Sequence, residues 1–352
     1  ILIQLSLAKL LFNSAYGKRS CYFYKMNLVT GGTGLVGTHI LIDLLKQNKQ
    51  VRAIKRENSN IELVNAVFKH YGIEDLFTKI EWVNADVLDI PSLESAIKGV
   101  TNVYHSAAIV SFNKKHFKKM YEVNVQGTTN IVNVSLSSNV RKIGHISSIA
   151  AIGRGKTNLF TEKNKWKTDK KNSYYAITKY SAEREIWRAQ QEGLSTVIVN
   201  PGIIFGPSSW HRSSTTLFKQ ISRGLSRYTP GTNGFVDVRD VSKSIVQLVD
   251  SEVSSERFIL VGQNLSYKEV FEKIANAMNK PVPNKEAKKW MMELAWRYES
   301  IRAFLRRKSP SITKETAMTA CEKYFYDASK IENTINFEFN SIGESIKNTA
   351  KF

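Results

Sequence analysis

Cysteine is scarce in this sequence, because Cys21 and Cys321 are the only two in a chain of 352 residues. Two cysteines cannot build the disulfide framework of a small secreted domain, and their spacing is not that of a zinc site. We therefore expect no metal site. The scarcity also favours a reducing compartment, so the predicted localisation is cytoplasmic.

Long apolar runs are missing as well. No uninterrupted apolar stretch is long enough to cross a bilayer, so we expect no integral membrane segment. The sequence also has no internal repeat and no long low-complexity segment. Hydrophobic residues make up 42% of the chain, which suffices for a large core. This content predicts one large domain, or a domain with a smaller lobe.

Acidic residues are few, since 31 Asp and Glu stand against 51 Lys and Arg and give a formal net charge of +20. Such an excess suits a basic face for an anionic partner, namely a nucleotide, a nucleic acid or a membrane. It also suits lysines spread over a solvated surface, which we favour because lysine recurs throughout the chain. No compact basic helix with interleaved aromatic residues marks a nucleic-acid module, so we expect no nucleic-acid partner.

Residues 1–25 differ from the rest of the chain. They contain four basic residues and no acidic one, and Met26 stands directly before the first expected strand. The apolar segment 1–12 is interrupted by polar residues and lacks a preceding basic region, so it would make a poorly formed signal peptide. We expect residues 1–25 to be a non-native or disordered extension, with Met26 as the natural start.

A glycine-rich stretch follows the first apolar run, and residues 27–37 read Asn-Leu-Val-Thr-Gly-Gly-Thr-Gly-Leu-Val-Gly. An amphipathic segment comes next, so the order is strand, tight turn and helix. This context and the glycine spacing fit the dinucleotide-binding fingerprint. Glycines let the backbone approach a pyrophosphate, and the helix start offers free N–H groups and a positive dipole end. The residues predicted to bind the dinucleotide here are Gly31, Thr33, Gly34, Leu35, Val36 and Gly37.

The next expected strand, residues 50–56, should end over the adenosine ribose of that dinucleotide. An acidic residue there would accept a hydrogen bond from the 2′-hydroxyl of NAD, whereas an arginine would pair with the 2′-phosphate of NADP. Arg56 lies nineteen positions after Gly37 with no acid before it in the strand, although Glu57 follows at once. We therefore predict that Arg56 binds the phosphate of NADP, with NAD as the alternative cofactor.

Strands alternate with helices through the first half of the chain. We expect further strands over residues 79–83, 100–108 and 142–148, and a long helix over residues 116–138. This alternation predicts an α/β fold, a doubly wound parallel sheet of the Rossmann type with its ligand at the carboxyl ends of the strands.

Tyr175 and Lys179 stand four positions apart, on one face of an expected helix. A nearby ammonium favours the phenolate and lowers a tyrosine pKa that is ordinarily about 10. Ser147 and Ser148 close the preceding strand, where a hydroxyl can hold a substrate oxygen. The set suits proton transfer to a carbonyl while a cofactor moves hydride. Each of these motifs is common on its own. The prediction depends on their order in the chain, after the glycine-rich turn.

With these motifs, the chain resembles an extended short-chain dehydrogenase/reductase of the NAD-dependent epimerase/dehydratase superfamily. Within it, the chain is similar to the dihydroflavonol-4-reductase-like branch, over about residues 26–339. The motifs that carry the resemblance are Thr30 to Gly37, Asp86-Val87, His105-Ser106-Ala107-Ala108, Asn124 to Thr128, Ser147-Ser148, Tyr175-x-x-x-Lys179 and Asn200 to Pro207.

The resemblance implies a role for each matching residue. Tyr175 would be the acid/base, and Lys179 would bind the nicotinamide ribose and tune Tyr175. Ser148 would be the catalytic serine, with Ser147 as the second candidate. The residues implied to line the cofactor are Asp86 and Val87 at the adenine, Ala107, Ala108 and Ser147, and Pro201, Gly202, Ile203 and Ile204 beside the nicotinamide amide.

The resemblance also implies a division of the chain. Residues 26–205 would form the NAD(P)-binding Rossmann domain, completed by parts of 235–262, and residues 206–352 would form mainly the substrate-binding lobe. Segment 235–241 is expected to link the lobe to the sheet. Residues 284–308 predict a basic, aromatic helix, and its apolar stripe is expected to pack over the substrate pocket, with peripheral membrane contact as the alternative.

The predicted activity is that of an NAD(P)-dependent oxidoreductase, an enzyme that reduces a carbonyl with NADPH or oxidises the alcohol in reverse. The alternative is a nucleotide-sugar epimerase or dehydratase that keeps NAD bound and uses the same Ser/Tyr/Lys set. Many sugar-nucleotide relatives carry an Arg-Asp pair where this chain has Asn233-Gly234. That contact to a diphosphate is therefore missing, although Arg223, Arg227 and Arg239 are available to replace it.

A non-catalytic dinucleotide sensor is a remote alternative, because its mark would be a broken Ser/Tyr/Lys set and this set is intact. The expected partner is a small-molecule carbonyl or sugar substrate. The sequence leaves a homodimer open.

Overall fold

The structure is a computed structural model. It describes residues 25–153, 158–169, 172–210, 213–306, 310 and 312–352. The expectation for residues 1–25 therefore lies outside the described residues, apart from Lys25.

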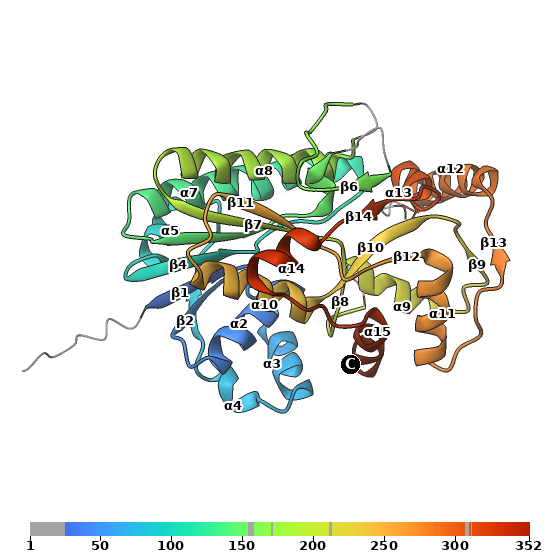
Figure 1. The fold of residues 1–352 in the computed structure, drawn as a ribbon. Coiled ribbons are helices and arrows are strands. Elements are labelled where there is room, and N and C mark those ends of the chain that lie inside the picture. The colour runs from blue at the N-terminus through green and yellow to red at the C-terminus, as the bar shows by residue number, and fades with distance from the viewer. Residues whose placement is uncertain (1–24, 154–157, 170–171, 211–212, 307–309, 311) are drawn as a thin grey trace, which may run out of the picture.

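The main sheet is a layer of parallel strands. These are β1 (Met26–Thr30), β2 (Val51–Lys55), β3 (Glu81–Asn84), β4 (Val100–His105), β5 (Lys142–Ile146), β7 (Ser195–Pro201) and β11 (Glu256–Leu260). Within the described residues these seven strands lie in the order β11-β7-β5-β4-β1-β2-β3 (Figure 1). Every neighbouring pair is parallel. The sheet is the doubly wound Rossmann type, which confirms the predicted fold class.

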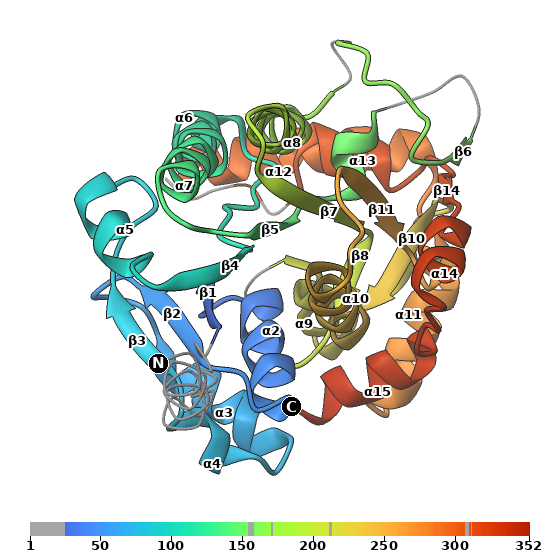
Figure 2. The same cartoon turned by 60° about the vertical axis from the view of Figure 1, so that its left-hand side comes forward.

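Helices cover both faces of this sheet, as Figures 1 and 2 show. Leu28 and Val29 are adjacent in β1 but enter different apolar cores, because successive side chains of a strand point to opposite faces. Both faces of the strands are therefore apolar, as a parallel sheet between two helical layers requires. One layer contains α2 (Leu35–Lys46), α3 (Ile61–His70) and α10 (Val238–Asp250), and the other contains α5 (Ile90–Ala96), α7 (Gly127–Leu136) and α8 (Tyr174–Gln191).

The expected strands occur, with small shifts at their ends. The strand expected over 79–83 is β3, which begins two residues later, at Glu81. The strands expected over 100–108 and 142–148 end at His105 and Ile146. The small residues predicted to line the site therefore lie in loops just beyond the carboxyl ends of β4 and β5.

The long helix expected over 116–138 is interrupted. α6 (Phe117–Tyr121) runs into a π-helical turn (Glu122–Gln126) before α7 begins. Asn124 in this turn is buried, and its amide accepts from the Ile109 N–H at 2.7 Å and donates to the Ile109 carbonyl at 3.0 Å. The wide turn thus presents a side chain that satisfies the backbone of the loop leaving β4.

A smaller sheet lies to one side of the main one (Figure 1). Within the described residues its three strands are β8 (Ile203–Phe205), β10 (Thr232–Asp237) and β12 (Gln263–Ser266). Phe205, Phe218 and Phe235 form its apolar core with side chains of α9 (Thr216–Ser222), α11 (Tyr267–Ala277) and α15 (Ile342–Lys351). The remaining elements are α4 (Glu74–Phe77), β6 (Leu159–Phe160), β9 (Arg227–Tyr228), β13 (Lys285–Glu286), α12 (Lys289–Leu305), α13 (Lys314–Thr319), β14 (Phe325–Tyr326) and α14 (Ser329–Ile335).

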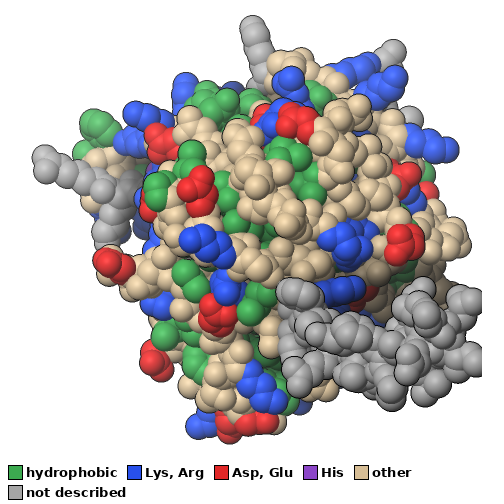
Figure 3. Space-filling view, turned by 90° about the vertical axis from the view of Figure 1, so that its left-hand side faces the viewer, with side chains coloured by type: hydrophobic (Ala, Val, Ile, Leu, Met, Phe, Trp, Pro, Cys, Tyr) green, Lys and Arg blue, Asp and Glu red, His purple; other side chains and the backbone are tan. Residues whose placement is uncertain are grey.

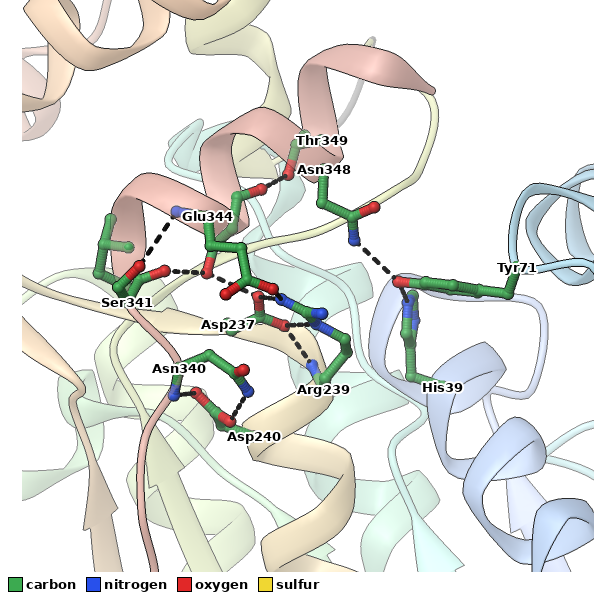
Figure 4. A network of polar contacts seen from close by, with 12 residues as sticks. His39, Tyr71, Asp237, Arg239, Asp240, Asn340, Ser341, Glu344, Asn348 and Thr349 are labelled. Atoms are coloured by element: carbon green, nitrogen blue, oxygen red, sulfur yellow. Dashed lines mark hydrogen bonds and ion pairs between the residues drawn. The ribbon is translucent and has the colours of Figure 1, made fainter.

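Segment 235–241 joins the two sheets, because it begins in β10 and continues into α10. Polar contacts reinforce the junction (Figure 4). Asp237 caps α10, pairs with Arg239 at 2.7 Å and accepts from the Ser345 hydroxyl of α15 at 2.6 Å. Asn348 of the same helix donates to the Tyr71 hydroxyl at 3.1 Å, just beyond α3. The last helix of the chain is thereby tied to the smaller sheet and to the helical layer of α3 and α10, and the segment has the linking role expected of it.

Charged residues are interspersed on the face seen in Figure 3, where basic, acidic and hydrophobic side chains alternate. No single-sign patch dominates the atoms coloured there. This face agrees with the interpretation that much of the positive charge is dispersed.

Lys142 is a buried cation at the start of β5. Its ammonium donates to the carbonyls of Leu248 at 2.7 Å, Ser251 at 2.8 Å and Val253 at 2.5 Å, at the carboxyl end of α10. Carbonyls at the end of a helix lack an N–H partner within the helix, and a positive charge there complements the helix dipole. Lys142 therefore fixes α10 to the sheet.

Replacing Lys142 with Met should lower the free energy of unfolding by about 2–4 kcal/mol, because buried carbonyls lose a charged donor. Chemical denaturation measures this change. Lys49→Met is the matched control, since Lys49 pairs with Asp250 at the same helix end but near the surface. It should cost less than about 1 kcal/mol. Equal losses in the two variants would contradict the anchoring role of Lys142.

Candidate functional site

The turn after β1 is so tight that two of its glycines have no room for a side chain. Gly31 has a φ of +68°, and a Cβ added to it would lie 2.7 Å from the Ala107 nitrogen. A Cβ on Gly37 would lie 2.1 Å from the Gly31 carbonyl oxygen. Both positions therefore require glycine. This packing brings the start of α2 against the ends of β1 and β4.

The start of α2 presents free N–H groups. Gly34 caps the helix in an extended conformation, its first turn holds no acidic residue, and no side chain of the described residues caps it. Gly34 is exposed, and Thr33, Leu35 and Val36 are partly exposed. Free N–H groups at a helix start, reinforced by its dipole, bind anions such as a pyrophosphate. The cradle therefore fits a dinucleotide.

A pocket of about 500 Å³ opens beside the ends of β2 and β3. Arg56 and Glu57 line it from β2, and Asp86 lines it from the loop after β3. The Arg56 guanidinium is exposed and pairs with no other described residue, since only its backbone N–H bonds a side chain. The Val87 side chain, in contrast, is buried in the core behind this pocket. The structure brings Arg56 and Asp86 to one cavity and turns Val87 away from it.

The other predicted cofactor residues gather along the same edge of the sheet. Ala107 and Ala108 follow β4, and the Ala107 N–H donates to the Thr30 hydroxyl at 3.2 Å. Pro201 ends β7, Gly202 connects it to β8, and Ile203 and Ile204 begin β8. Ala108 is exposed, while Gly202, Ile203 and Ile204 are partly exposed, so solvent reaches this edge.

Ser148 and Tyr175 meet beyond the end of β5. Ser148 begins a short 3₁₀ helix (Ile149–Ile152), and Tyr175 lies in the first turn of α8. Burial raises the pKa of Tyr175, and a hydrogen bond with the Ser148 hydroxyl acts in the opposite direction. The phenol therefore stays protonated at neutral pH unless further positive charge supports its ionised form.

Lys179 supplies positive charge one helical turn after Tyr175. Its side chain is buried, and its ammonium donates to the Ile146 carbonyl at 2.7 Å. Burial lowers the pKa of Lys179 to about 8, although the charge of Glu183 acts to raise it. Tyr175, Lys179 and Glu183 lie four positions apart on one face of α8.

Glu183 was not singled out by the sequence, yet it organises the strand ends. It is fully buried, and its carboxylate accepts from the Ser147 hydroxyl and from the Asn200 amide, both at 2.5 Å. Arg257 pairs with its other oxygen at 3.3 Å. Asn200 also donates to the Ser148 carbonyl at 2.9 Å. Ser147 thus faces Glu183, while Ser148 faces Tyr175.

One signal for Glu183 was present in the sequence, namely its four-residue spacing from Lys179. Its partners lie up to 74 positions away, so only the fold reveals them.

Comparison with known proteins places this site in a family. Residues 27–262 match the family described as "NAD dependent epimerase/dehydratase family". The chain belongs to this family. It is an NAD(P)-dependent enzyme, of the reductases, dehydrogenases and epimerases that make up the superfamily.

Two similar proteins are named as reductases. A Synechocystis sp. protein named "Putative dihydroflavonol 4-reductase" is 30% identical over 337 residues, which cover 93% of this chain and 92% of that one. "Tetraketide alpha-pyrone reductase 2" of Arabidopsis thaliana is 28% identical, over 73% of this chain and 84% of that one. These names bear out the suspected resemblance to the dihydroflavonol-reductase-like branch.

A solved structure shares the fold of this epimerase/dehydratase family member. "MoeE5 in complex with UDP-glucose and NAD" superposes with a TM-score of 0.70 at 17% identity, over 92% of this chain and 97% of that one.

Among the described residues, every helix is too short or too polar to traverse a bilayer.

Two buried histidines stack behind the enzyme's strand ends. The rings of His105 and His145 lie 5.2 Å apart, centroid to centroid. His105 bonds the Thr30 hydroxyl at 2.7 Å and the Thr128 hydroxyl at 2.9 Å. Burial and the charge of Lys179 lower the pKa of His105 to about 3 and lower the pKa of His145 well below its usual range. Both rings are therefore neutral at physiological pH, so they add no positive charge around Lys179.

The Phe112 ring lies against Tyr175. It meets the Tyr175 ring edge-on at 5.8 Å, and the Phe112 side chain is exposed.

Replacing Glu183 with Gln should lower the pKa of Lys179 below its value of about 8. The change removes a negative charge that stabilises the ammonium and leaves the positive charge of Arg257 in place. The measurement is an NMR titration of lysine Cε resonances, with the Lys179 signal assigned by its loss in Lys179→Arg. Glu185→Gln, on the same helix but paired with Arg188 near the surface, is the control and should leave the titration unchanged. An unchanged or raised pKa in Glu183→Gln would refute the coupling.

Proposed function

We propose that this enzyme reduces a carbonyl group with NADPH, or oxidises the corresponding alcohol in the reverse direction. The observation that carries the proposal is the position of Tyr175, which has the Ser148 hydroxyl beside it and the buried ammonium of Lys179 one helical turn away. Like the glycine-rich turn, these groups lie beyond the carboxyl end of a strand of the Rossmann sheet, at the edge where ligands bind.

Tyr175 is the proposed acid/base. In reduction its hydroxyl gives a proton to the carbonyl oxygen, and in oxidation its phenolate takes the proton of the alcohol. Because burial raises the pKa of Tyr175, the phenolate needs support, which the Ser148 hydroxyl and the Lys179 ammonium provide. The bound dinucleotide supplies or accepts the hydride.

The proposed cofactor site runs along the carboxyl edge of the main sheet. Free N–H groups after Gly34 suit the pyrophosphate, and Asp86 lies in the pocket where the adenosine end belongs. Lys179 is proposed to bind the nicotinamide ribose. The remaining proposed contacts are Gly31, Thr33, Leu35, Val36, Gly37, Val87, Ala107, Ala108, Ser147, Pro201, Gly202, Ile203 and Ile204, as the family resemblance implies.

NADP is the proposed cofactor rather than NAD. The support is the unpaired guanidinium of Arg56 at the lip of the adenosine pocket. A guanidinium binds phosphate with paired, charge-assisted hydrogen bonds, so this position favours a 2′-phosphate.

Carbonyl reduction is favoured over sugar-nucleotide chemistry because Asn233-Gly234 replace the Arg-Asp pair of many sugar-nucleotide relatives and Arg239 is already paired with Asp237 and Glu344. Of the other arginines expected to be able to hold a diphosphate, Arg223 and Arg227 remain exposed. Epimerisation or dehydration with bound NAD is the second candidate, since MoeE5 shares the fold and is described with UDP-glucose and NAD.

The roles of the two parts of the chain and the cellular location are also proposals. Residues 26–205, completed by parts of 235–262, are proposed to bind the cofactor, and residues 206–352 to bind mainly the substrate. A cytoplasmic location is proposed because only two cysteines occur and Cys321 is free.

The proposed reaction predicts loss of nicotinamide absorbance when the enzyme is incubated with NADPH and a panel of aldehydes and ketones. Tyr175→Phe should lower kcat by about 100-fold or more, because it removes the proton donor and little volume. Dinucleotide binding, followed by fluorescence, should change little in this variant. In parallel, UDP- and GDP-sugars are incubated without added cofactor. Epimers formed there, with no NADPH oxidised on any carbonyl, would establish the second candidate instead.

Replacing Arg56 with Ala should raise the Kd for NADPH by roughly 10–100-fold, because a charged contact to phosphate contributes about 1.5–3 kcal/mol. The Kd for NADH should change by less than about threefold, since NADH lacks that phosphate. Calorimetric titration measures both. Arg223→Ala, an exposed arginine in the smaller lobe, should bind both cofactors like the wild type. Equal weakening for the two cofactors in Arg56→Ala, or a wild type that prefers NADH, would show that Arg56 does not bind the 2′-phosphate.

A further inference from the structure

Helix α12 presents large apolar side chains to solvent. Six of its described residues, Trp290, Leu294, Tyr298, Ile301, Phe304 and Leu305, are between 56% and 79% exposed. Their spacing of three or four positions places them on one face of the helix, a surface that we call the apolar stripe. The stripe does not pack over a pocket as expected from the sequence.

The opposite face of α12 is the one that packs. Glu299 and Ala303 are the buried side chains of this helix, and the Trp296 indole donates to Glu293 at 3.0 Å. A helix that packs on a core normally buries its apolar residues and exposes its charges. α12 has the reverse orientation. Several large apolar side chains exposed on one face in this way mark a site of interaction rather than ordinary exposure.

The residues that flank the apolar stripe are mainly basic. Residues 288–306 contain five basic side chains, Lys288, Lys289, Arg297, Arg302 and Arg306, against two acidic ones. Three of the five basic side chains are paired, because Arg297 pairs with Glu293 and Arg302 with Glu299, each at 2.8 Å, and Lys289 pairs with Glu322 at 3.2 Å. Lys288 and Arg306, at the two ends of the helix, are exposed. The surface is therefore apolar along its centre and positive at its ends.

This combination suits an anionic lipid surface. Amphipathic helices that lie in the membrane interface bury an apolar face among the acyl chains and place Lys and Arg beside anionic headgroups. Trp and Tyr are favoured at that depth because their rings are amphipathic. A second copy of the chain fits less well, since a symmetric contact through α12 would bring equal positive charges together. The overall charge of +20 adds a long-range attraction of the same sign.

The position of α12 permits such docking. Figure 1 shows α12 and α13 at the end of the molecule opposite β1 and β2. The helix lies on the outside of the fold, and its described neighbours leave the stripe uncovered. The adenosine pocket, beside the ends of β2 and β3, lies away from it.

We propose that α12 docks this enzyme on membranes that contain anionic lipids, with the helix lying in the interface and not crossing the bilayer. The enzyme thereby works at a lipid surface. This inference rests on the stripe and its charges and is independent of the proposed reaction.

The experiment is flotation of the full chain with vesicles of phosphatidylcholine alone and of phosphatidylcholine mixed with phosphatidylserine. The wild type should bind the mixed vesicles and lose this binding as salt is raised. The triple variant Ile301→Gln, Phe304→Gln, Leu305→Gln should bind them roughly tenfold or more weakly, because it removes apolar contacts with the acyl region. Lys288→Gln with Arg306→Gln should weaken binding to the mixed vesicles and reduce its salt dependence.

The matched control is Leu88→Gln with Ile90→Gln, which alters exposed apolar side chains elsewhere on the surface. It should bind vesicles like the wild type. Circular dichroism and thermal unfolding check that each variant is folded, which is expected because every altered side chain is exposed. Equal binding by the wild type and the α12 triple variant would overturn the proposal. A second outcome would also overturn it. In that outcome the wild type does not bind the vesicles and sediments as a dimer, whereas the triple variant sediments as a monomer.

Discussion

The buried carboxylate of Glu183 is the constraint on which the proposed catalytic edge depends. A carboxylate removed from water needs charged or hydrogen-bonding partners. Here three neighbouring strands supply them, through Ser147 beyond β5, Asn200 in β7 and Arg257 in β11. Because Asn200 also binds the Ser148 carbonyl, the same carboxylate fixes the backbone from which the Ser148 hydroxyl extends. α8 carries Glu183 together with Tyr175 and Lys179, so one rigid helix holds the proposed proton-transfer groups and their support.

The cofactor side of the site is shaped by backbone rather than by side chains. At Gly31 and Gly37 the chain passes too close to itself for any Cβ, and the start of α2 is left with N–H groups that only an anion or water satisfies. The two halves of the site therefore differ in the substitutions that they tolerate. At the glycine positions, the lack of space excludes any side chain. In the proposed catalytic half charge is decisive, since burial lowers the pKa of Lys179 to about 8 and the charge of Glu183 acts to raise it.

Much of this fold can be predicted from the sequence because it follows from local patterns. The glycine-rich turn, the alternating strands and helices and the Tyr175–Lys179 spacing are all short-range features, and they predicted the Rossmann sheet. Features that depend on distant partners were not predictable. The π-helical turn at Asn124 exists because its amide binds Ile109, fifteen positions away. Glu183 meets Arg257 across 74 positions, and Lys142 reaches carbonyls more than a hundred positions later. A single sequence shows that such side chains are polar, not that they are buried.

Helix α12 is a second feature that the sequence alone did not decide. Periodicity established that its apolar residues share a face, but periodicity carries no information about whether that face turns inward or outward. The packing of Glu299 and Ala303 decides it. Two departures from the usual distribution of polarity therefore mark this enzyme, a cluster of charge inside at Lys179, Glu183 and Arg257 and a stripe of apolar side chains outside on α12. Each is unfavourable for an isolated fold unless something compensates it. The inner cluster is compensated by its own hydrogen bonds, within the chain. The outer stripe has no such compensation among the described residues. The proposed membrane surface would supply it, and the positive charge at the ends of the helix would select anionic lipids.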